Sequence, residues 1–516
     1  MFTPDTLPQG YDKVARKPDL WLETRASPLR CAAMSDREAR ANLSAAQRRA
    51  VAELLQVSPV ADELGRRFAE AGYELHLVGG SVRDALLGRL GEDLDFATNA
   101  RPEQTQELLK DWAEAIWTTG AEFGTIGAAK RGLRVEVTTY RAEAYDRVSR
   151  NPIVRYGTSL QDDLRRRDFT VNAMAVSVPA HKFSDPYGGL DDLAAKRLRT
   201  PGAPEDSFAD DPLRMLRAAR FASQLRFEVD RPVVAAMTAM AGDLARITAE
   251  RIRDEFVKLL SGADPVAGLR MLVDTGLAEQ FLPELPGMRM AIDEHHQHKD
   301  VYEHTLTVVR NAIRLEDGGP DFVLRMAALM HDVGKPATKR NEPGGRVSFH
   351  HHEVVGARMA EERLRALRYP SAVVEDVRRL VEMHLRFHGY GGGWSDSAVR
   401  RFVRDAGHLL DKLNQLTRAD VTTANLFKAK QFRALQEELE ERIARLAEQE
   451  NLEALRPPLD GNEVMEHLGL QPGPPVGEAI DYLMELRLER GPIDKEEAYR
   501  LLDEWAREKG LQKAEE

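Results

Sequence analysis

The stretch of residues 74–95 (ELHLVGGSVRDALLGRLGEDLD) constrains the fold most, because it joins an apolar run, a glycine pair and two closely spaced acids. The apolar run, residues 75–78, predicts a short strand that stops at Gly79 and Gly80. Ser81 is placed to cap a helix that follows directly. The stretch therefore predicts a strand, a tight turn and a helix.

The turn is suited to bind an anion. Glycine has no Cβ, so the backbone at Gly79 and Gly80 can approach a ligand closely. Free N–H groups at the start of a helix attract negative charge, and Arg83 adds a cation nearby. We therefore expect Gly79, Gly80 and Arg83 to contact the phosphates of a nucleotide.

The paired acids point to a metal. If residues 93–96 form a strand, its two-residue period places Asp93 and Asp95 on one face and Leu94 and Phe96 on the other. Neighbouring carboxylates repel each other unless a cation lies between them, and a divalent metal is the usual solution. A phosphate-binding turn beside this pair indicates metal-assisted nucleotidyl transfer, with Asp93 and Asp95 as catalytic metal ligands.

A third acid lies in residues 133–139 (LRVEVTT), which alternate as a strand with Glu136 on one face. Glu136 is a candidate catalytic residue if its strand neighbours that of Asp93 and Asp95. The alternative is a solvated sheet face.

Residues 166–174 (RRDFTVNAM) follow the strands. Arginine is a forked donor suited to triphosphate oxygens, and Asn172 could contact a sugar or base. Arg167, Asp168 and Asn172 are therefore candidate nucleotide-binding residues, although an arginine pair before an apolar run can also be a charged helix entry.

The composition limits which classes of protein the chain can belong to. The chain has 516 residues, enough for several domains, and no apolar run long enough for a membrane helix. A single cysteine, Cys31, fits a reducing cytoplasm. The net charge of −11 argues mildly against nucleic-acid binding, although a local basic groove can coexist with an acidic whole.

Several of these motifs recur together in one known family. Over about residues 60–290 the chain resembles the class II tRNA nucleotidyltransferase and poly(A) polymerase family. The resemblance rests on these motifs, in this order: GGSVRD, DLD, EVTTYR, RRDFTVNAM, DPYGGLDDL, FADDPLRMLRAARFA and ERIRDEFVKLL. The resemblance implies an α+β chain, with a mixed-sheet head of the polymerase-beta type followed by an all-α neck and body. It also implies addition of C, C and A from CTP and ATP to the 3′ end of tRNA, with Mg²⁺ and without a nucleic-acid template.

Base selection is expected at Asp211 and Arg214. Three residues apart on one helix, they would share a face, with Arg217 and Arg220 along the same side. A carboxylate accepts the exocyclic amine of cytosine or adenine, so such a pair can favour C and A over U and G. The family uses this pair as an amino-acid template, preceded by glutamate where this chain has Asp210. The alternative is an exposed helix with ion pairs and an apolar stripe.

Most histidines lie between residues 293 and 420. Imidazoles and carboxylates together suit a transition metal. The pattern resembles the HD phosphohydrolase domain, all-α and followed by a helical tail, and it implies a first metal site at His304, His331, Asp332 and Asp420. His352 and His384 match positions available to a second metal, such as Ni²⁺, Mn²⁺ or Fe²⁺.

Other polar groups lie near this pattern. Lys335 could contact a phosphate, and phosphatase or 2′,3′-cyclic phosphodiesterase activity is implied, with catalysis left open. Further histidines in this part of the chain could each replace one of these ligands: His295, His296, His298, His350 and His351.

The expected domains are a disordered arm (1–50), the head (51–180), the neck and body (181–290), the HD domain (291–425) and a helical tail (426–516). Within the last two, residues 389–393 (GYGGG) predict a flexible loop and residues 431–450 a long charged helix.

The leading hypothesis is a CCA-adding enzyme that binds tRNA, CTP and ATP and no membrane, with oligomeric state open. Alternatives are an enzyme that adds only CC or only A, a poly(A) polymerase, a nucleotide phosphohydrolase with a sensing head, and a catalytically dead tRNA-binding protein. Residues 140–164 resemble a flexible loop that permits the switch to ATP, which argues against CC addition alone.

Overall fold

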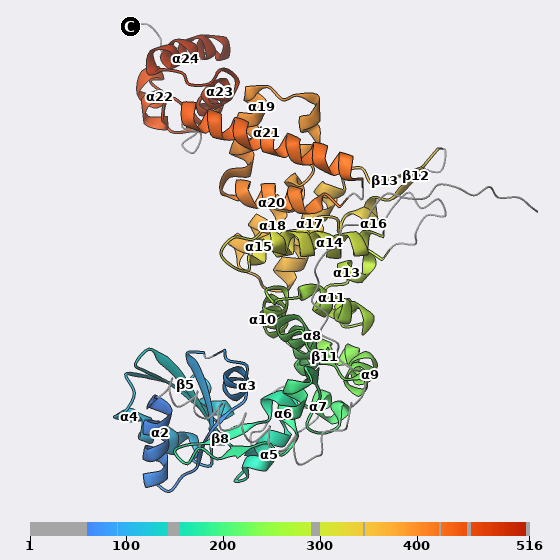
Figure 1. Cartoon of the computed structure of the whole chain (residues 1–516). Coiled ribbons are helices and arrows are strands. Elements are labelled where there is room, and N and C mark those ends of the chain that lie inside the picture. Colours follow the sequence, from blue (N-terminus) through green and yellow to red (C-terminus); the bar gives the residue numbers. More distant parts are fainter. Residues whose placement is uncertain are drawn as a thin grey trace, which may run out of the picture. The chain divides into compact units, whose positions relative to one another are not determined.

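The computed structural model describes residues 59–89, 91–142, 155–289, 300–343, 346–422, 425–450 and 456–511 (Figure 1). The predicted N-terminal arm, residues 1–50, lies outside the described residues. None of the described helices combines the length and apolar character needed to cross a membrane.

The first folded region is built on a seven-stranded mixed sheet. Its strands, in spatial order, are β3 (Ala115–Trp117), β4 (Thr125–Lys130), β5 (Leu133–Thr139), β2 (Asp93–Thr98), β1 (Leu75–Val78), β8 (Ala175–Ser177) and β9 (Phe183–Ser184). β2 and β5 are parallel and the other neighbouring pairs are antiparallel. The expected mixed sheet is therefore confirmed.

The helices of this region cover the sheet and connect its strands. They are α2 (Pro59–Glu70), α3 (Gly80–Leu86), α4 (Pro102–Lys110), α5 (Leu160–Arg165) and the 3₁₀ turns η1 (Ala121–Phe123) and η2 (Thr170–Asn172). α2 buries Leu64 and Phe68 completely, so an amphipathic helix packs onto the strands that follow it. A separate two-stranded ribbon pairs β6 (Arg141–Ala142) with β7 (Arg155–Tyr156).

A helical region follows the sheet. Its elements are α6 (Gly189–Ala194), α7 (Pro204–Asp210), α8 (Leu213–Leu225), α9 (Arg231–Met240), η3 (Ala241–Arg246), α10 (Ala249–Leu260), α11 (Pro265–Asp274), α12 (Ala278–Phe281) and α13 (Glu284–Gly287), with the short parallel pair β10 (Arg197–Leu198) and β11 (Glu228–Val229). α8 packs against both α10 and α11. It is the central helix of this region, which is why its side chains can link several others.

The histidine-rich region is also helical. Its elements are α14 (Val301–Arg314), α15 (Phe322–Met330), α16 (Lys335–Thr338), α17 (His352–Ala366), α18 (Ser371–Met383), η4 (Arg386–Gly392), α19 (Asp396–Ala406), η5 (Gly407–Leu409) and α20 (Leu410–Asp420), with one hairpin of β12 (Arg340–Glu342) and β13 (Arg346–Ser348). The loop expected at residues 389–393 is mostly 3₁₀ helix. Phe387 and Tyr390 are buried and stacked there, and they fix a backbone whose glycines alone predict freedom.

The last region holds the expected long helix and three shorter ones: α21 (Leu426–Glu450), α22 (Gly461–Leu468), α23 (Pro474–Arg490) and α24 (Lys495–Lys509). Asp460 and Glu463 cap the start of α22 reciprocally, which fixes where that helix begins. The three shorter helices share one apolar cluster that includes Leu483, Leu502 and Trp505.

Candidate active sites in the sheet region and the histidine-rich region

The predicted alternation of the DLD strand is present. In β2, Leu94 and Phe96 are buried, whereas Asp93 is exposed and Asp95 only partly buried. β5 runs parallel to β2 with Glu136 in register with Asp95. In-register residues of neighbouring strands point to the same side of a sheet. The structure therefore brings the three predicted catalytic acids together.

The acids affect one another electrostatically. Burial raises the pKa of Asp95 most, Glu136 and Asp93 raise it further, and Arg167 and Arg83 oppose the increase. A carboxylate in such an environment is stabilised in its charged form by an added cation. Oxygen ligands of this kind suit Mg²⁺, so Asp93 and Asp95 fit a divalent metal site.

Ser81 has a different role from the one expected. The N-cap of α3 is Gly79, because the helix begins at Gly80, and no side chain caps it. The Ser81 hydroxyl instead donates to the Asp93 carbonyl oxygen (3.2 Å) and accepts from the Asp95 amide (3.0 Å). The glycine turn is therefore fastened to the strand that carries the two acids.

The backbone of Gly79 favours glycine. Its φ is +70°, and a Cβ atom there would lie 2.7 Å from Nη1 of Arg167. Arg167 is thus held against the turn, and its Nη2 donates to Asp163 at 3.2 Å. Asp163 also accepts from Arg166 at 2.6 Å, so one carboxylate positions both arginines. No motif had singled out Asp163.

Four of the predicted nucleotide-binding residues form one hydrogen-bonded chain. Arg83 Nη1 donates to Asn172 Oδ1 (2.6 Å), and Asn172 Nδ2 donates to Asp168 Oδ1 (2.9 Å). Arg217 donates to the other Asp168 oxygen from Nε (2.8 Å) and Nη2 (2.6 Å). Burial opposes ionisation of Asp168, but Arg217 and Asn172 outweigh it and hold its pKa far below the usual value. This chain fixes the sheet region to α8.

Two further residues complete this junction. Glu255 of α10 pairs with Arg220 Nε (2.6 Å) and lies 3.6 Å from Arg217 Nη1. The ring of Phe221 lies 4.1–5.7 Å from the guanidinium carbons of Arg83, Arg217 and Arg220, within cation–π range. Glu255 belongs to the motif ERIRDEFVKLL, but the motif alone did not indicate its contact with the arginines, and neither Glu255 nor Phe221 was a predicted site residue.

The expectation that Asp211 and Arg214 share one helical face is wrong. Asp211 has extended backbone at the end of α7, because the residue before a proline is disfavoured in the helical region, and α8 begins at Leu213 directly after Pro212. Asp211 accepts from Arg251 Nη2 at 2.7 Å. Arg214 instead donates to the Ser207 hydroxyl (2.9 Å) and the carbonyl of Arg166 (2.6 Å). The two side chains lie at one junction but are held by separate partners.

In the second region, six predicted ligands converge from helices α14, α17 and α20 and from the segments directly after α15 and α18. We call this group the histidine cluster, and it consists of His304, His331, Asp332, His352, His384 and Asp420. His331 and Asp332 are completely buried, so a charge there needs compensation from within the protein.

Asp332 lies at the centre and serves two sets of histidines. Its Oδ2 lies 3.4 Å from His304 Nε2 and 3.2 Å from His331 Nε2. Its Oδ1 lies 3.2 Å from His352 Nε2 and 3.9 Å from His384 Nε2. Each set has ligand atoms within 4.8 Å of one another, so the cluster can hold two metal ions that share one carboxylate.

Asp420 completes the first set. Its Oδ1 lies 3.0 Å from His304 Nε2 and 3.5 Å from His331 Nε2. The carboxylates of Asp332 and Asp420 outweigh burial and raise the pKa of His331 to about 10. The first set therefore favours added positive charge, which a metal cation would supply.

Backbone carbonyls orient the imidazoles. The Nδ1 atoms of His331, His352 and His384 donate to the carbonyls of Ala328, Phe349 and Val381, at 2.9, 2.8 and 2.7 Å. A carbonyl can only accept, so a ring in its neutral form presents an unprotonated Nε2 to the cluster, and His331 would take this form when a bound metal displaces its proton.

Two of these nitrogens lack a well-formed hydrogen bond. The Nε2 atoms of His352 and His384 are buried, and among the described residues their nearest acceptor is Asp332 Oδ1, at 3.2 and 3.9 Å, with no hydrogen bond of good geometry. Burial, and then His331, lower the pKa of His384 to about 3, which keeps it neutral. Neutral buried imidazoles with free lone pairs are what a transition metal requires.

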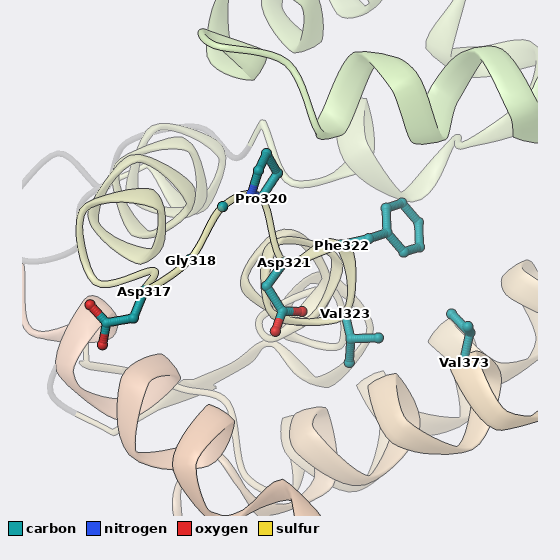
Figure 2. A pocket seen from close by; sticks show the side chains of 8 residues that line it. Asp317, Gly318, Pro320, Asp321, Phe322, Val323 and Val373 are labelled. Atoms are coloured by element: carbon teal, nitrogen blue, oxygen red, sulfur yellow. The ribbon is translucent and has the colours of Figure 1, made fainter. Parts of the chain in front are cut away.

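Lys335 donates to Asp332 Oδ2 at 2.6 Å, which places it beside the cluster. His350 and His351 are exposed, and His351 lies 3.8 Å from Glu353, so neither joins the ligands. His295, His296 and His298 lie outside the described residues. A surface hollow on the turn between α14 and α15, opposite Val373, contains no predicted ligand (Figure 2).

Family models match three parts of the chain: the poly(A) polymerase head domain at residues 75–199, the probable RNA- and SrmB-binding site of polymerase A at 226–288, and the HD domain at 301–451. The central part of the loop-like segment, residues 143–154, lies outside the described residues, while β6 and β7 pair at its ends.

Three known proteins are similar to the chain. An A-adding tRNA nucleotidyltransferase from Deinococcus radiodurans is 35% identical over 443 residues, 84% of this chain and 95% of the relative. A CCA-adding enzyme from Levilactobacillus brevis is 41% identical over 225 residues, 43% of this chain and 55% of the relative. The crystal structure of the Bacillus stearothermophilus CCA-adding enzyme in complex with CTP matches with a TM-score of 0.61 and 26% identity, covering 88% of this chain and 99% of that one.

Proposed function

Because the chain belongs to the tRNA nucleotidyltransferase family with a poly(A) polymerase head, we propose that it adds the CCA terminus to the 3′ end of tRNA from CTP and ATP. The observation that carries this proposal is the grouping of Asp93, Asp95 and Glu136 on one sheet face beside the Gly79 turn. The single cysteine, Cys31, supports a reducing compartment such as the cytoplasm.

The residues of the sheet region take distinct roles in this reaction. Mg²⁺ ions held by Asp93 and Asp95 would supply the charge that neutralises the triphosphate and lowers the pKa of the tRNA 3′ hydroxyl. Glu136 assists this site from the neighbouring strand. The turn at Gly79 and Gly80 leaves room for phosphates, with Arg167 held against it.

Base selection belongs to the junction with α8. Asp211 and Arg214 would bind the Watson–Crick edge, after Asp211 releases Arg251. A hydrogen-bonded chain holds that junction in a fixed position relative to the acids. It consists of Arg83, Asn172, Asp168 and Arg217. Glu255 pairs with Arg220 and also lies near Arg217, so this carboxylate offsets the charge of both arginines.

Replacing Asp95 by Asn tests the metal-ligand role. We expect incorporation of both CTP and ATP to fall to below about 1% of the wild-type rate, because the metal loses a charged ligand. Primer extension with labelled nucleotides measures it. Asp111→Asn, which changes an exposed carboxylate at the end of α4, serves as the control and should retain full activity. Substantial activity in Asp95→Asn would refute the assignment.

A-only addition is the second candidate, and one observation favours it. The A-adding relative matches over 95% of its length, whereas the L. brevis CCA-adding enzyme matches over 55% of its length. Three tRNA substrates, ending at the discriminator base, after one C and after CC, separate the candidates when each is offered CTP and ATP. CCA addition extends all three, A-only addition extends the last alone, and a poly(A) polymerase extends any of them with long A tails.

For the histidine cluster we propose a transition-metal phosphohydrolase site. The support is the pair of buried Nε2 atoms of His352 and His384, which lack a hydrogen bond of good geometry, and the shared carboxylate of Asp332. Metals such as Ni²⁺, Mn²⁺ or Fe²⁺ would supply an activated water there. Lys335 is placed to contact a phosphate.

Metal analysis tests this second site. The double variant His331→Ala/Asp332→Ala removes two ligands, and we expect the protein to lose its bound transition metal. His351→Ala changes an exposed histidine outside the cluster and should leave the metal content unchanged. Equal metal content in wild type and the double variant would contradict the proposal.

A further inference from the structure

The start of α21 exposes two large apolar side chains. Leu426 is 85% exposed and Phe427 69% exposed, far above the 42% and 37% of the other exposed large hydrophobic residues among those described, Phe123 and Val354. Asn425 fixes the helix start, since its Oδ1 accepts from the amides of Phe427 (3.0 Å) and Lys428 (3.1 Å). Exposure of neighbouring Leu and Phe side chains on a capped helix indicates a binding surface.

Basic residues lie on the same face. At 100° per residue, Leu426, Phe427, Lys430 and Arg433 fall within one side of the helix. The opposite side holds the packed residues, Phe432, Leu435, Gln436 and Leu439. The apolar and basic side chains therefore point away from the protein together.

These cations are not neutralised within the part of the chain that the structure describes. Lys428, Lys430 and Arg433 form no ion pair there, whereas their neighbours do: Arg418 pairs with Glu440, and Arg442 with Asp396 at 2.6 Å. Against a net charge of −11, this is a local positive surface. It is complementary to a polyanion.

The surface lies close to the histidine cluster in the chain. Thr422 is hydrogen-bonded to Nδ1 of His304 at 3.0 Å. Five residues lie between Asp420 and Leu426, so α21 begins within about 20 Å of a candidate metal ligand. A polymer bound on α21 could thus place its end in the cluster.

We propose that Leu426, Phe427, Lys430 and Arg433, the α21 ridge, bind the single-stranded 3′ end of an RNA and present its terminal phosphate to the histidine cluster. Bases stack on exposed aromatic surface without sequence preference, and lysine and arginine attract the backbone phosphates. The inference deepens the proposed phosphohydrolase function, on which it rests, because it assigns polynucleotide ends as the substrate class.

Binding tests the ridge separately from catalysis. Fluorescence anisotropy with a labelled, unstructured oligoribonucleotide that ends in a phosphate should show at least tenfold weaker affinity for Lys430→Glu/Arg433→Glu. The slope of log affinity against log salt should fall by roughly 1.4 for the two lost cations. Phe427→Ser should weaken binding without changing that slope. Arg507→Glu, an exposed arginine on α24, should bind as the wild type does.

The Asp332→Ala variant separates the two proposals, because it removes the shared metal ligand but leaves the ridge intact. RNA binding that persists in Asp332→Ala and is lost in the ridge variants supports the ridge, even if no phosphate ester is hydrolysed. Equal RNA affinity of Lys430→Glu/Arg433→Glu and Arg507→Glu would refute the proposal that the α21 ridge binds RNA. A protein partner would then be the remaining candidate for this surface. Failure of the wild type to bind metal would refute only the phosphohydrolase function.

Discussion

At the scale of single residues, Asp163 explains how the two arginines before Asp168 are held. Its side chain is 1% exposed and accepts from both Arg166 and Arg167. Burial alone would raise the pKa of Asp163, but Arg167 and Arg166 outweigh it and lower the pKa below the usual value. The residue thus contributes to stability through its charge.

We expect Asp163→Asn to lower the free energy of unfolding by about 2–4 kcal/mol at neutral pH, because two charge-assisted contacts are lost and two arginines remain. Because the folded pKa is depressed, this contribution is fully present above the unfolded pKa of about 4 and is lost as the pH falls through the folded pKa. Urea unfolding followed by tryptophan fluorescence at neutral and acidic pH measures it.

The exposed neighbour provides the control. Asp162→Asn should change stability by no more than about 0.5 kcal/mol. A difference between wild type and Asp163→Asn that grows on acidification would contradict the assigned sign.

At the scale of elements, helix packing around α8 depends on close backbone approach. Gly268 of α11 faces α8, and a Cβ atom there would lie 2.8 Å from the carbonyl oxygen of Ala219 and 3.0 Å from Leu259. A backbone atom cannot move aside as a flexible side chain can. The position of α11 therefore requires glycine.

Gly268→Ala should destabilise the protein by about 1–3 kcal/mol through overpacking. Thermal unfolding measures this loss. Gly242→Ala is the matched control, since a Cβ atom there has open space. Equal melting temperatures for the two variants would show that α11 can shift without cost.

At the scale of the whole molecule, Glu450 joins three elements at the end of α21. It accepts from Arg400 of α19 at 2.7 and 2.8 Å and from Arg487 of α23 at 3.2 Å. All three side chains are nearly buried. A buried, shared carboxylate of this kind attaches the terminal helices to the histidine-rich region.

Removing this carboxylate in Glu450→Ala should lower the local opening free energy of α23 by about 1.5–3 kcal/mol. Hydrogen exchange measured by mass spectrometry should then be faster in α23 and unchanged in the sheet region. Glu448→Ala, an exposed neighbour on α21, should exchange like the wild type. Unchanged protection of α23 in Glu450→Ala would show that its apolar cluster alone holds it.

Local patterns predicted much of this molecule. Alternation along residues 93–96 predicted the strand and the face of its acids, and the resemblance to the HD domain predicted which residues form the histidine cluster. The flexible loop predicted from the glycines at 389–393 is wrong, because local composition does not show that Phe387 and Tyr390 are buried in the folded chain.

The sequence by itself determined the elements, the order of the motifs and the chemistry of the ligands, since periodicity and residue type act within a few positions. Only the tertiary structure decided that Glu136 lies beside Asp95, that Asp332 serves two sets of histidines, and that Asp163 and Glu255 hold the arginines. These contacts join residues distant in the chain, as Arg217 and Asp168 are 49 positions apart. Such pairing depends on how the packed elements fit together, which no local pattern records.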